Sequence, residues 1–176
     1  NGPLGGAALT LVLSVVSAIA SGVLGLVFGV ALAMARGAAH SVLLMGLGFF
    51  RAIPVIMLIF WTYFLLPILF GIDVPGTGTV VVALSLTGGS YRARWVHAGI
   101  ASLLSGQWQA AAALGLSRGQ ALRLVILPQA LPIMVPSFIN QWVALIKDTS
   151  LAYVIGVGEL SFVATQVSNR EMVYPT

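Results

Sequence analysis

Long apolar stretches separated by short polar interruptions make up most of the chain. Residues 5–35 carry no charged side chain before Arg36, and further apolar stretches cover residues 41–70 and 79–100. A fourth begins between residues 130 and 135 and runs to residue 156. Because about 20 apolar residues suffice for a helix to cross a bilayer, the pattern predicts four membrane-spanning helices.

Proline and glycine residues interrupt this pattern at defined places. Pro54, one turn after Arg51, interrupts the second stretch, because a proline inside a helix leaves one carbonyl without its donor. Residues 71–78, GIDVPGTG, are predicted to form a loop, since glycine and proline punctuate them. In the first stretch, the glycines include a small-xxx-small pair, which would let another helix approach closely. They are Gly22, Gly25 and Gly29.

The composition agrees with a membrane environment. Of the 176 residues, 59% are hydrophobic and only 7% are charged, whereas roughly a quarter of the residues of a soluble domain are charged. The net charge of +4 is small and indicates membrane topology rather than binding to nucleic acid. We therefore expect an all-α fold, a polytopic bundle of transmembrane helices.

Residues 105–128 stand apart from the apolar stretches and are predicted to form a helix, a glycine turn and a second helix. Residues 107–114 are good helix formers, and Gly115 follows where a helix ends with a left-handed residue. Ser117 and Gln120 have the spacing of a capping box, so a second helix should begin there and reach the membrane near Pro128. We call this segment the elbow.

Positive charges orient the helices. Arg36 follows the first stretch, and Arg118 and Arg123 lie in the elbow. Because cytoplasmic connections carry an excess of lysine and arginine, both of these connections are expected in the cytoplasm and residues 71–78 outside.

The elbow sequence resembles a known signature. QAAAALG, LSRGQALRL and VILP are similar to the EAA signature of ABC importer permeases, with Gln109 where the family usually has glutamate. FFRAIPVIMLIFWTYFLLP, AGIASLLSGQ and IKDTSLAYVIGVGEL resemble segments of the permeases for polar and acidic amino acids. The resemblance covers most of residues 49–160.

The resemblance implies a type I importer permease subunit, a single transmembrane domain over residues 1–176, without catalytic or metal site and without a cofactor of its own. The family has a fifth helix after the region of Tyr174, so four spans of five are expected here. Two cassette ATPases, which use ATP and Mg²⁺, would bind the elbow. Other implied partners are a second permease subunit, an external solute-binding protein, the amino-acid substrate and membrane lipid, in a bacterial inner membrane.

The residues expected to couple to the ATPase follow from the signature and its turn. Small alanine side chains permit close docking in a groove, and Gly115 supplies a turn that a bulky residue would strain. The expected coupling residues are Gln109, Ala110, Ala111, Gly115, Ser117, Arg118 and Pro128.

Two other function classes are also compatible with an apolar helical chain. An intramembrane hydrolase would need Ser90 and His97 as a dyad, but seven residues along one helix separate them by about 10 Å. The chain also has neither the HExxH motif of a metalloprotease nor the phosphate-binding loop of an ATPase. A passive channel or scaffold is an alternative that composition leaves open.

The resemblance also suggests a substrate path. Its KDTSL segment places Asp148, Thr149 and Ser150 at the transport cavity, and Tyr91 matches the amino-acid permeases. The alternative for Asp148 is a buried ion pair with an arginine of the second or third span. Arg51 is expected to extend toward lipid phosphates.

Arg94 carries the substrate hypothesis. It stands where these permeases usually have glutamate, and His97 where they usually have arginine. Arg92 and Arg94 lie two residues apart and should point to different sides of their helix. If Arg94 faces the cavity, it could bind a carboxylate in a bidentate manner, which predicts glutamate or aspartate as the substrate. The alternative is that both arginines extend toward the membrane surface or pair with the companion subunit.

Overall fold

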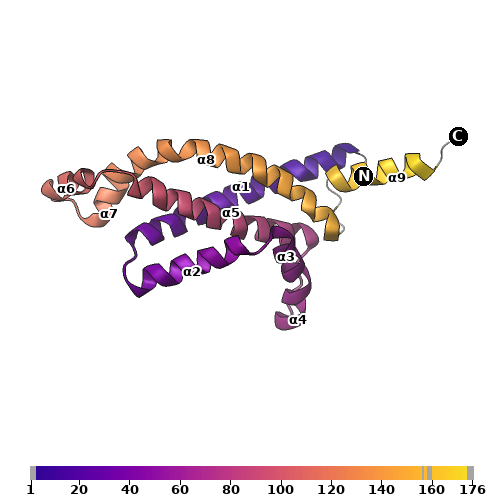
Figure 1. The fold of residues 1–176 in the computed structure, drawn as a ribbon. Coiled ribbons are helices and arrows are strands. Elements are labelled where there is room, and N and C mark those ends of the chain that lie inside the picture. The colour runs from indigo at the N-terminus through magenta and orange to yellow at the C-terminus, as the bar shows by residue number, and fades with distance from the viewer. Residues whose placement is uncertain (1–2, 156, 158–159, 174–176) are drawn as a thin grey trace.

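The computed structural model describes residues 3–155, 157 and 160–173, and every regular element within them is a helix (Figure 1). Three long helices run along the molecule: α1 (Pro3–Met34), α5 (Gly76–Ala101) and α8 (Leu127–Asp148). The shorter helices are α2 (Ala38–Ala52), α3 (Val55–Phe60), α4 (Leu66–Phe70), α6 (Ser105–Ala113), α7 (Arg118–Ala121) and α9 (Leu160–Val173). The predicted all-α fold is confirmed.

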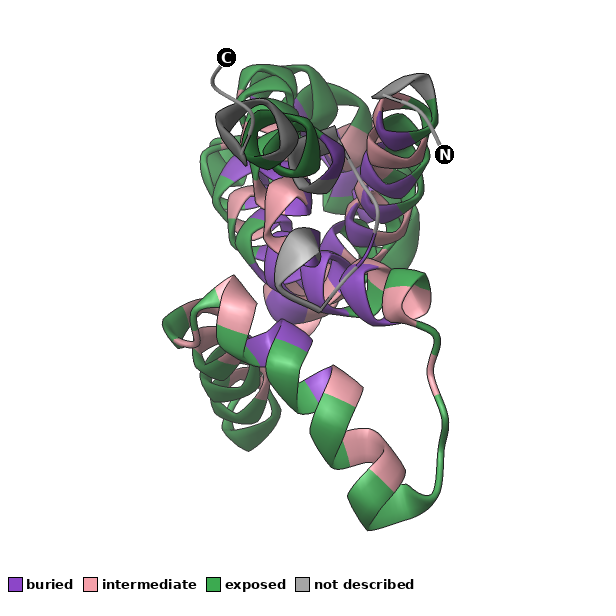
Figure 2. Ribbon diagram, turned by 90° about the vertical axis from the view of Figure 1, so that its right-hand side faces the viewer, coloured by how far each residue is buried: buried purple, intermediate pink, exposed green. Residues whose placement is uncertain are grey.

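Helix α5 is the central element, since α1, α2 and α8 all pack against it. Buried residues gather where these helices face one another, and the outward faces are exposed (Figure 2). Gly25 and Gly29 bring α1 against α5, because a Cβ added at either would overlap the α5 side chains Arg92 or Val96. The predicted close approach is confirmed for this pair, whereas Gly22 has open space in front of it.

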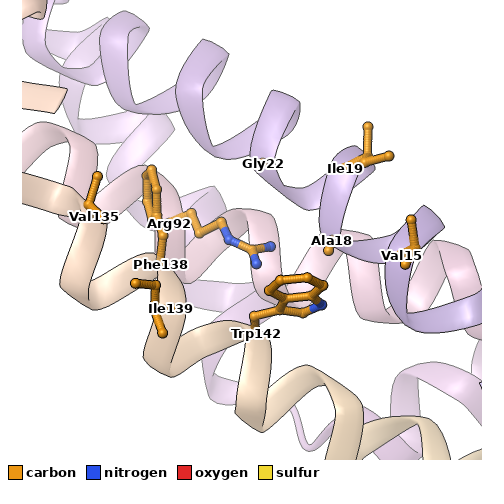
Figure 3. Close-up of a pocket in the computed structure, with 9 residues that line it drawn as sticks. All are labelled: Val15, Ala18, Ile19, Gly22, Arg92, Val135, Phe138, Ile139 and Trp142. Carbon is orange, nitrogen blue, oxygen red and sulfur yellow. The ribbon is translucent and has the colours of Figure 1, made fainter. Parts of the chain in front are cut away.

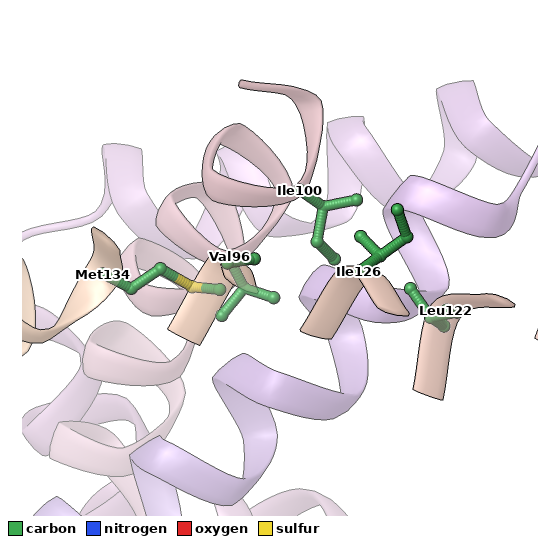
Figure 4. Packing of buried hydrophobic residues seen from close by; sticks show 6 residues of the cluster. Val96, Ile100, Leu122, Ile126 and Met134 are labelled. Atoms are coloured by element: carbon green, nitrogen blue, oxygen red, sulfur yellow. The ribbon is translucent and has the colours of Figure 1, made fainter. Parts of the chain in front are cut away.

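A buried apolar cluster joins the end of α5 to the beginning of the last long helix (Figure 4). Val96 and Ile100 of α5 meet Leu122, Ile126 and Met134, and all five are buried. Helices α6 and α7 lie beyond this cluster at one end of the molecule, while the N-terminus and α9 lie at the opposite end (Figure 1). The cluster therefore fixes the elbow end to two of the long helices.

The second apolar stretch does not form one continuous span. Helix α2 ends at Ala52, and the helical segment Val55–Phe70 leaves it at an angle of 96°. Ile53 has an extended ψ of 129°, because the Pro54 ring disfavours the helical conformation of the residue before it, and the proline nitrogen cannot continue the hydrogen-bonded ladder. The predicted interruption at Pro54 is confirmed, and the structure adds that one helix ends before the proline and another starts after it.

Two π turns precede prolines at the same offset. The turn η1 (Trp61–Leu65) ends two residues before Pro67, and η2 (Leu122–Ile126) ends two residues before Pro128. In η2, the Leu127 N–H donates to the Leu122 carbonyl, five residues back. A proline ring clashes with the carbonyl four residues before it, and a widened turn moves that carbonyl away.

One predicted boundary is wrong, and another stays a prediction. Helix α5 begins at Gly76, so only residues 71–75 of the predicted loop are non-helical. Helical structure is continuous over Arg118–Ala152, so the start of the fourth span within it, expected at residues 130–135, stays a prediction. Pro132 and Pro136 lie inside α8, and the 3-10 turn η3 (Thr149–Ile155) follows it. Residue 156, the expected end of this span, lies outside the described residues.

The number of spans stays a prediction. Over the described part of the chain, Gly5–Met34 and Arg118–Ala152 are long and apolar enough to cross a membrane. The bent pair Ala38–Ala52 and Val55–Phe70 would be a third span if counted as one. Helix α5 is central but less apolar than these segments, because it carries Arg92 and Arg94 among glycine, serine and threonine residues.

Candidate functional site

The elbow turns at Gly115 in the geometry that its sequence predicts. Gly115 has a φ of 76°, a left-handed value that a residue with a side chain rarely adopts. Its N–H donates to the Ala112 carbonyl at 3.0 Å, and the Leu116 N–H donates to the Ala111 carbonyl at 3.1 Å. These two bonds form a Schellman motif, which satisfies carbonyls at the end of α6.

The capping box at the start of α7 is also confirmed. The Ser117 N–H donates to Gln120 Oε1 at 2.9 Å, and the Gln120 N–H donates to Ser117 Oγ at 3.3 Å. Arg118 lies over the ring of Trp108, with its guanidinium carbon 5.6 Å from the ring centroid. Trp108 in turn packs against the buried cluster of α5 and η2. The Trp108 side chain therefore connects α6 both to α7 and to this cluster.

Most of the expected coupling residues are exposed, and one is not. Gln109, Ala110, Gly115, Ser117, Arg118 and Pro128 are exposed, whereas Ala111 is only 1% exposed and faces the protein's own helices. Leu104 and Leu114, at the two ends of α6, are 80% and 79% exposed. Sequence reasoning missed both, although leucines beside a polar turn are a visible signal of an apolar docking surface.

A cavity of about 310 Å³, which we call the central pocket, lies at the break in the second apolar stretch. Tyr91 and Asp148, both expected in the substrate path, line it together. The other polar side chains on its wall are Arg51, Thr87 and Gln141, none of which was expected there. Thr87 Oγ1 is buried and has no hydrogen-bond partner within the described chain.

Thr149 and Ser150 do not line the central pocket. The Thr149 hydroxyl is buried and donates to the Ile146 carbonyl at 2.6 Å. The Ser150 hydroxyl donates to the Lys147 carbonyl at 2.6 Å. Both side chains bond to the preceding helical turn, which a residue pattern alone does not show.

Asp148 and Arg51 share the central pocket without forming an ion pair. No salt bridge within 4.0 Å joins these two described residues, although both line the same cavity. The alternative of a closed Asp148–arginine pair is therefore not what the structure contains. Two opposite charges face one cavity, separated by space that a ligand could occupy.

Arg94 lies in a different cavity, of about 300 Å³, which we call the basic cavity. It is lined by Arg51, Arg94, His40 and His97 together with apolar side chains. Arg51 is the residue that lines both the central pocket and the basic cavity. The structure thus separates Arg94 from Tyr91 and Asp148.

Arg92 points away from Arg94, as the spacing predicts. Its side chain is 4% exposed, and its Nη1 donates to Ser21 Oγ of α1. The guanidinium reaches an otherwise apolar groove of about 430 Å³ between α1 and α8 (Figure 3). Val15 and Ile19 of α1 and Phe138 and Trp142 of α8 form part of its walls.

Ser90 and His97 do not form a dyad. The Ser90 hydroxyl donates to the Leu86 carbonyl at 2.8 Å, and the ring of His97 lies beside that of His40. Over the described ranges, no three histidine, aspartate or glutamate side chains come together as a metal site would require.

Comparison with known proteins identifies relatives over nearly the whole chain. The probable amino-acid ABC transporter permease y4tF of Sinorhizobium fredii is 37% identical over 174 residues, covering 96% of this chain and 73% of the relative. The glutamine transport system permease GlnP of Escherichia coli K12 is 38% identical over 157 residues, covering 89% of this chain and 72% of the relative. Relatives named for arginine, ArtQ of Bacillus subtilis, and for glutamate and aspartate, GltK of Escherichia coli, match at 34% and 35% identity.

The fold matches as well. A crystal structure of an amino acid ABC transporter with histidines superimposes with a TM-score of 0.83 at 26% identity, covering 95% of this chain and 78% of the other. The family described as the binding-protein-dependent transport system inner membrane component matches residues 25–175. The chain therefore belongs to this family, and within it to the permease subunits of type I amino-acid ABC importers.

Proposed function

We propose that the elbow transmits the movement of a cytoplasmic ATPase to the walls of the central pocket. The observation that carries this proposal is the buried cluster between them. Leu122 and Ile126, directly after α7, pack on Val96 and Ile100 of α5. Helices α5 and α8 also supply Tyr91 and Asp148 to the pocket, so a displacement of the elbow moves two of its walls.

The exposed surface of the elbow suits a protein partner. Leu104 and Leu114 present apolar side chains on either side of small alanines, and Gln109 offers an uncharged hydrogen-bonding group where the related permeases usually have glutamate. The ATPase subunits that bind there would use ATP and Mg²⁺, and this chain would contribute no ATPase site. A second permease subunit and an external solute-binding protein would complete the importer in a bacterial inner membrane.

The central pocket suits the zwitterionic part of an amino acid. The Arg51 guanidinium can bind the α-carboxylate and the Asp148 carboxylate the α-ammonium, while Thr87, Tyr91 and Gln141 offer neutral hydrogen-bonding groups. Because a charge at membrane depth costs a few kcal/mol, Arg51 and Asp148 without a mutual ion pair favour a ligand that carries both opposite charges.

The finer proposal is that the substrate is glutamate or aspartate, with Arg94 as the partner of the side-chain carboxylate. Two arginines and two histidines line the basic cavity, which favours an anion over a cation. The relatives are named for glutamine, for arginine, and for glutamate and aspartate, so the similarity supports an amino acid in general.

The coupling proposal is tested at Gly115. Gly115→Asp and Gly115→Ala should allow assembly but leave ATP hydrolysis without uptake, because a left-handed residue with a Cβ costs roughly 1–2 kcal/mol. Gly106→Ala is the matched control, since Gly106 lies in α6 of the same elbow, has no positive φ and faces open space. Normal coupled uptake by both Gly115 variants would contradict the proposal.

The substrate proposal is tested by uptake into proteoliposomes that contain the complete importer. Asp148→Asn should reduce uptake of every amino acid by about tenfold or more, because a hydrogen bond to a charged group is worth about 1.5–3 kcal/mol. Arg94→Ala and Arg94→Lys should reduce uptake of glutamate more than uptake of glutamine. Unchanged glutamate uptake by both Arg94 variants, or a wild type that prefers arginine, would reject the acidic substrate.

A further inference from the structure

The basic cavity brings two arginines and two histidines together between three helices. His40 and Arg51 come from α2, Arg94 and His97 from α5, and α1 contributes the buried Leu32. The remaining lining residues are Leu44, Leu47 and Ala98, so within the described part of the chain no acidic side chain lines the cavity beside these four basic groups.

One histidine of the cavity is held by a hydrogen bond, whereas the two arginines lack acidic partners among the described residues. His40 Nδ1 lies 3.1 Å from the Leu32 carbonyl oxygen, which can only accept, so this ring is held with Nδ1 as the donor. The centroids of the His40 and His97 rings are 5.8 Å apart. Arg51 Nε is buried without a hydrogen-bond partner in the described chain, and Arg94 makes no ion pair with any described residue.

The basic cavity lies nearer to the elbow than the central pocket does. Helix α5 runs toward the elbow, and it contributes Thr87 and Tyr91 to the pocket but Arg94 and His97 to the cavity. At a rise of 1.5 Å per residue, Thr87 and His97 are about 15 Å apart along the helix axis. Arg51 lines both spaces, so a ligand passing between them keeps one guanidinium partner throughout.

The like charges of Arg51 and Arg94 repel each other, and an anion between them would supply the counter-charge that the described lining residues do not provide. We propose that the basic cavity is a separate anion-binding site on the elbow side of the central pocket, and that its ligand is a dicarboxylate. The site holds carboxylates through the guanidinium groups of Arg51 and Arg94, with His97 beside them, and without the ammonium contact at Asp148. The choice of a carboxylate rests on the proposed amino-acid transport, whereas the anion site rests on the cavity itself.

The test uses glutarate, a dicarboxylate without an ammonium group, on the purified importer in phosphatidylcholine nanodiscs. Thermal unfolding is followed by tryptophan fluorescence at constant ionic strength, since a ligand that binds the folded state raises the unfolding temperature. Glutarate should stabilise the wild type in a saturable way, and glutaramide, its uncharged diamide, should not. No stabilisation by glutarate would overturn the proposal, whatever the uptake measurements show.

Variants locate the site. Arg94→Gln and His97→Gln should each raise the apparent Kd for glutarate, by about tenfold or more for Arg94→Gln. Arg36→Gln is the matched control, because Arg36 is exposed at the turn between α1 and α2 and is not part of the cavity wall. Asp148→Asn should also leave glutarate binding intact, which separates this site from the ammonium contact of the proposed function. An unchanged Kd in both cavity variants, or loss of binding in Arg36→Gln, would place the anion elsewhere.

A phosphate group shares the same oxyanion chemistry and can come from lipid or from solution. The measurement is therefore repeated with inorganic phosphate and in phosphatidylglycerol nanodiscs. Glutarate should bind better than phosphate and equally well in both kinds of nanodisc. Stronger binding of phosphate, or loss of glutarate binding in phosphatidylglycerol, would show that the ligand is a phosphate and reject the dicarboxylate.

Discussion

Replacing Gly29 by alanine should separate α1 from α5. The new methyl carbon would lie 2.5 Å from Val96 Cβ and 2.7 Å from the Ala93 carbonyl oxygen. Carbon atoms pack best at roughly 3.5–4.0 Å, so the two helices would have to move apart by about 1 Å. Because Ala93 presents a backbone atom, no rotamer change can relieve that contact. Overpacking of this kind costs typically about 1–3 kcal/mol.

Gly22→Ala is the matched control, because it makes the same change in the same helix. Nothing lies within 4 Å of a Cβ added at Gly22. Both variants gain the same higher helix propensity of alanine, up to about 1 kcal/mol, so this contribution cancels when they are compared. The difference in unfolding free energy between them should therefore be about 1–3 kcal/mol, the overpacking cost alone.

The assay is unfolding of the permease complex in mixed detergent micelles by increasing amounts of sodium dodecyl sulfate, followed by tryptophan fluorescence. Gly29→Ala should unfold at a lower fraction of the denaturing detergent than Gly22→Ala, and Gly22→Ala should match or exceed the wild type. Equal midpoints for the two variants would refute the reasoning, because they would show that α1 and α5 are not in contact at Gly29.

Two further predictions concern the elbow and the orientation of the chain. Ser117→Ala removes the acceptor of the Gln120 N–H, which should cost about 1 kcal/mol and accelerate hydrogen exchange at the start of α7, while an unchanged exchange rate would show that the capping box contributes nothing. The chain has no cysteine, so Ile72→Cys and Gly119→Cys each introduce a single label site. A membrane-impermeant maleimide should label residue 72 from outside and residue 119 only after permeabilisation, and the reverse pattern would overturn the predicted topology.

Features that depend on neighbouring residues were predictable from the sequence. The turn at Gly115 and the capping box of Ser117 and Gln120 arise from hydrogen bonds that reach no further than five residues. The long apolar stretches predicted helices for the same local reason, since in lipid a backbone polar group must find its partner within its own segment. The resemblance of the elbow to the EAA signature led to the correct family.

Features that depend on how helices meet were not predictable. Pro54 ends a helix, whereas Pro132 and Pro136 lie within one, because the surroundings of each proline decide how the missing hydrogen bond is accommodated. The widened turn before Pro128 was likewise not predictable, because it is one of several ways in which a helix can accommodate a proline.

The sequence by itself determined which segments are helical, where the elbow turns and which charged residues the membrane must accommodate. Only the tertiary structure decided which of those charges share a cavity. After the sharp bend that follows α2, Arg51 lines one cavity together with Tyr91 and Asp148. The face of α5 that carries Arg94 lines a second cavity, where His40 also lies. Residues 40 or more positions apart meet because of helix packing, in which close approach at Gly25 and Gly29 sets how α1 lies on α5.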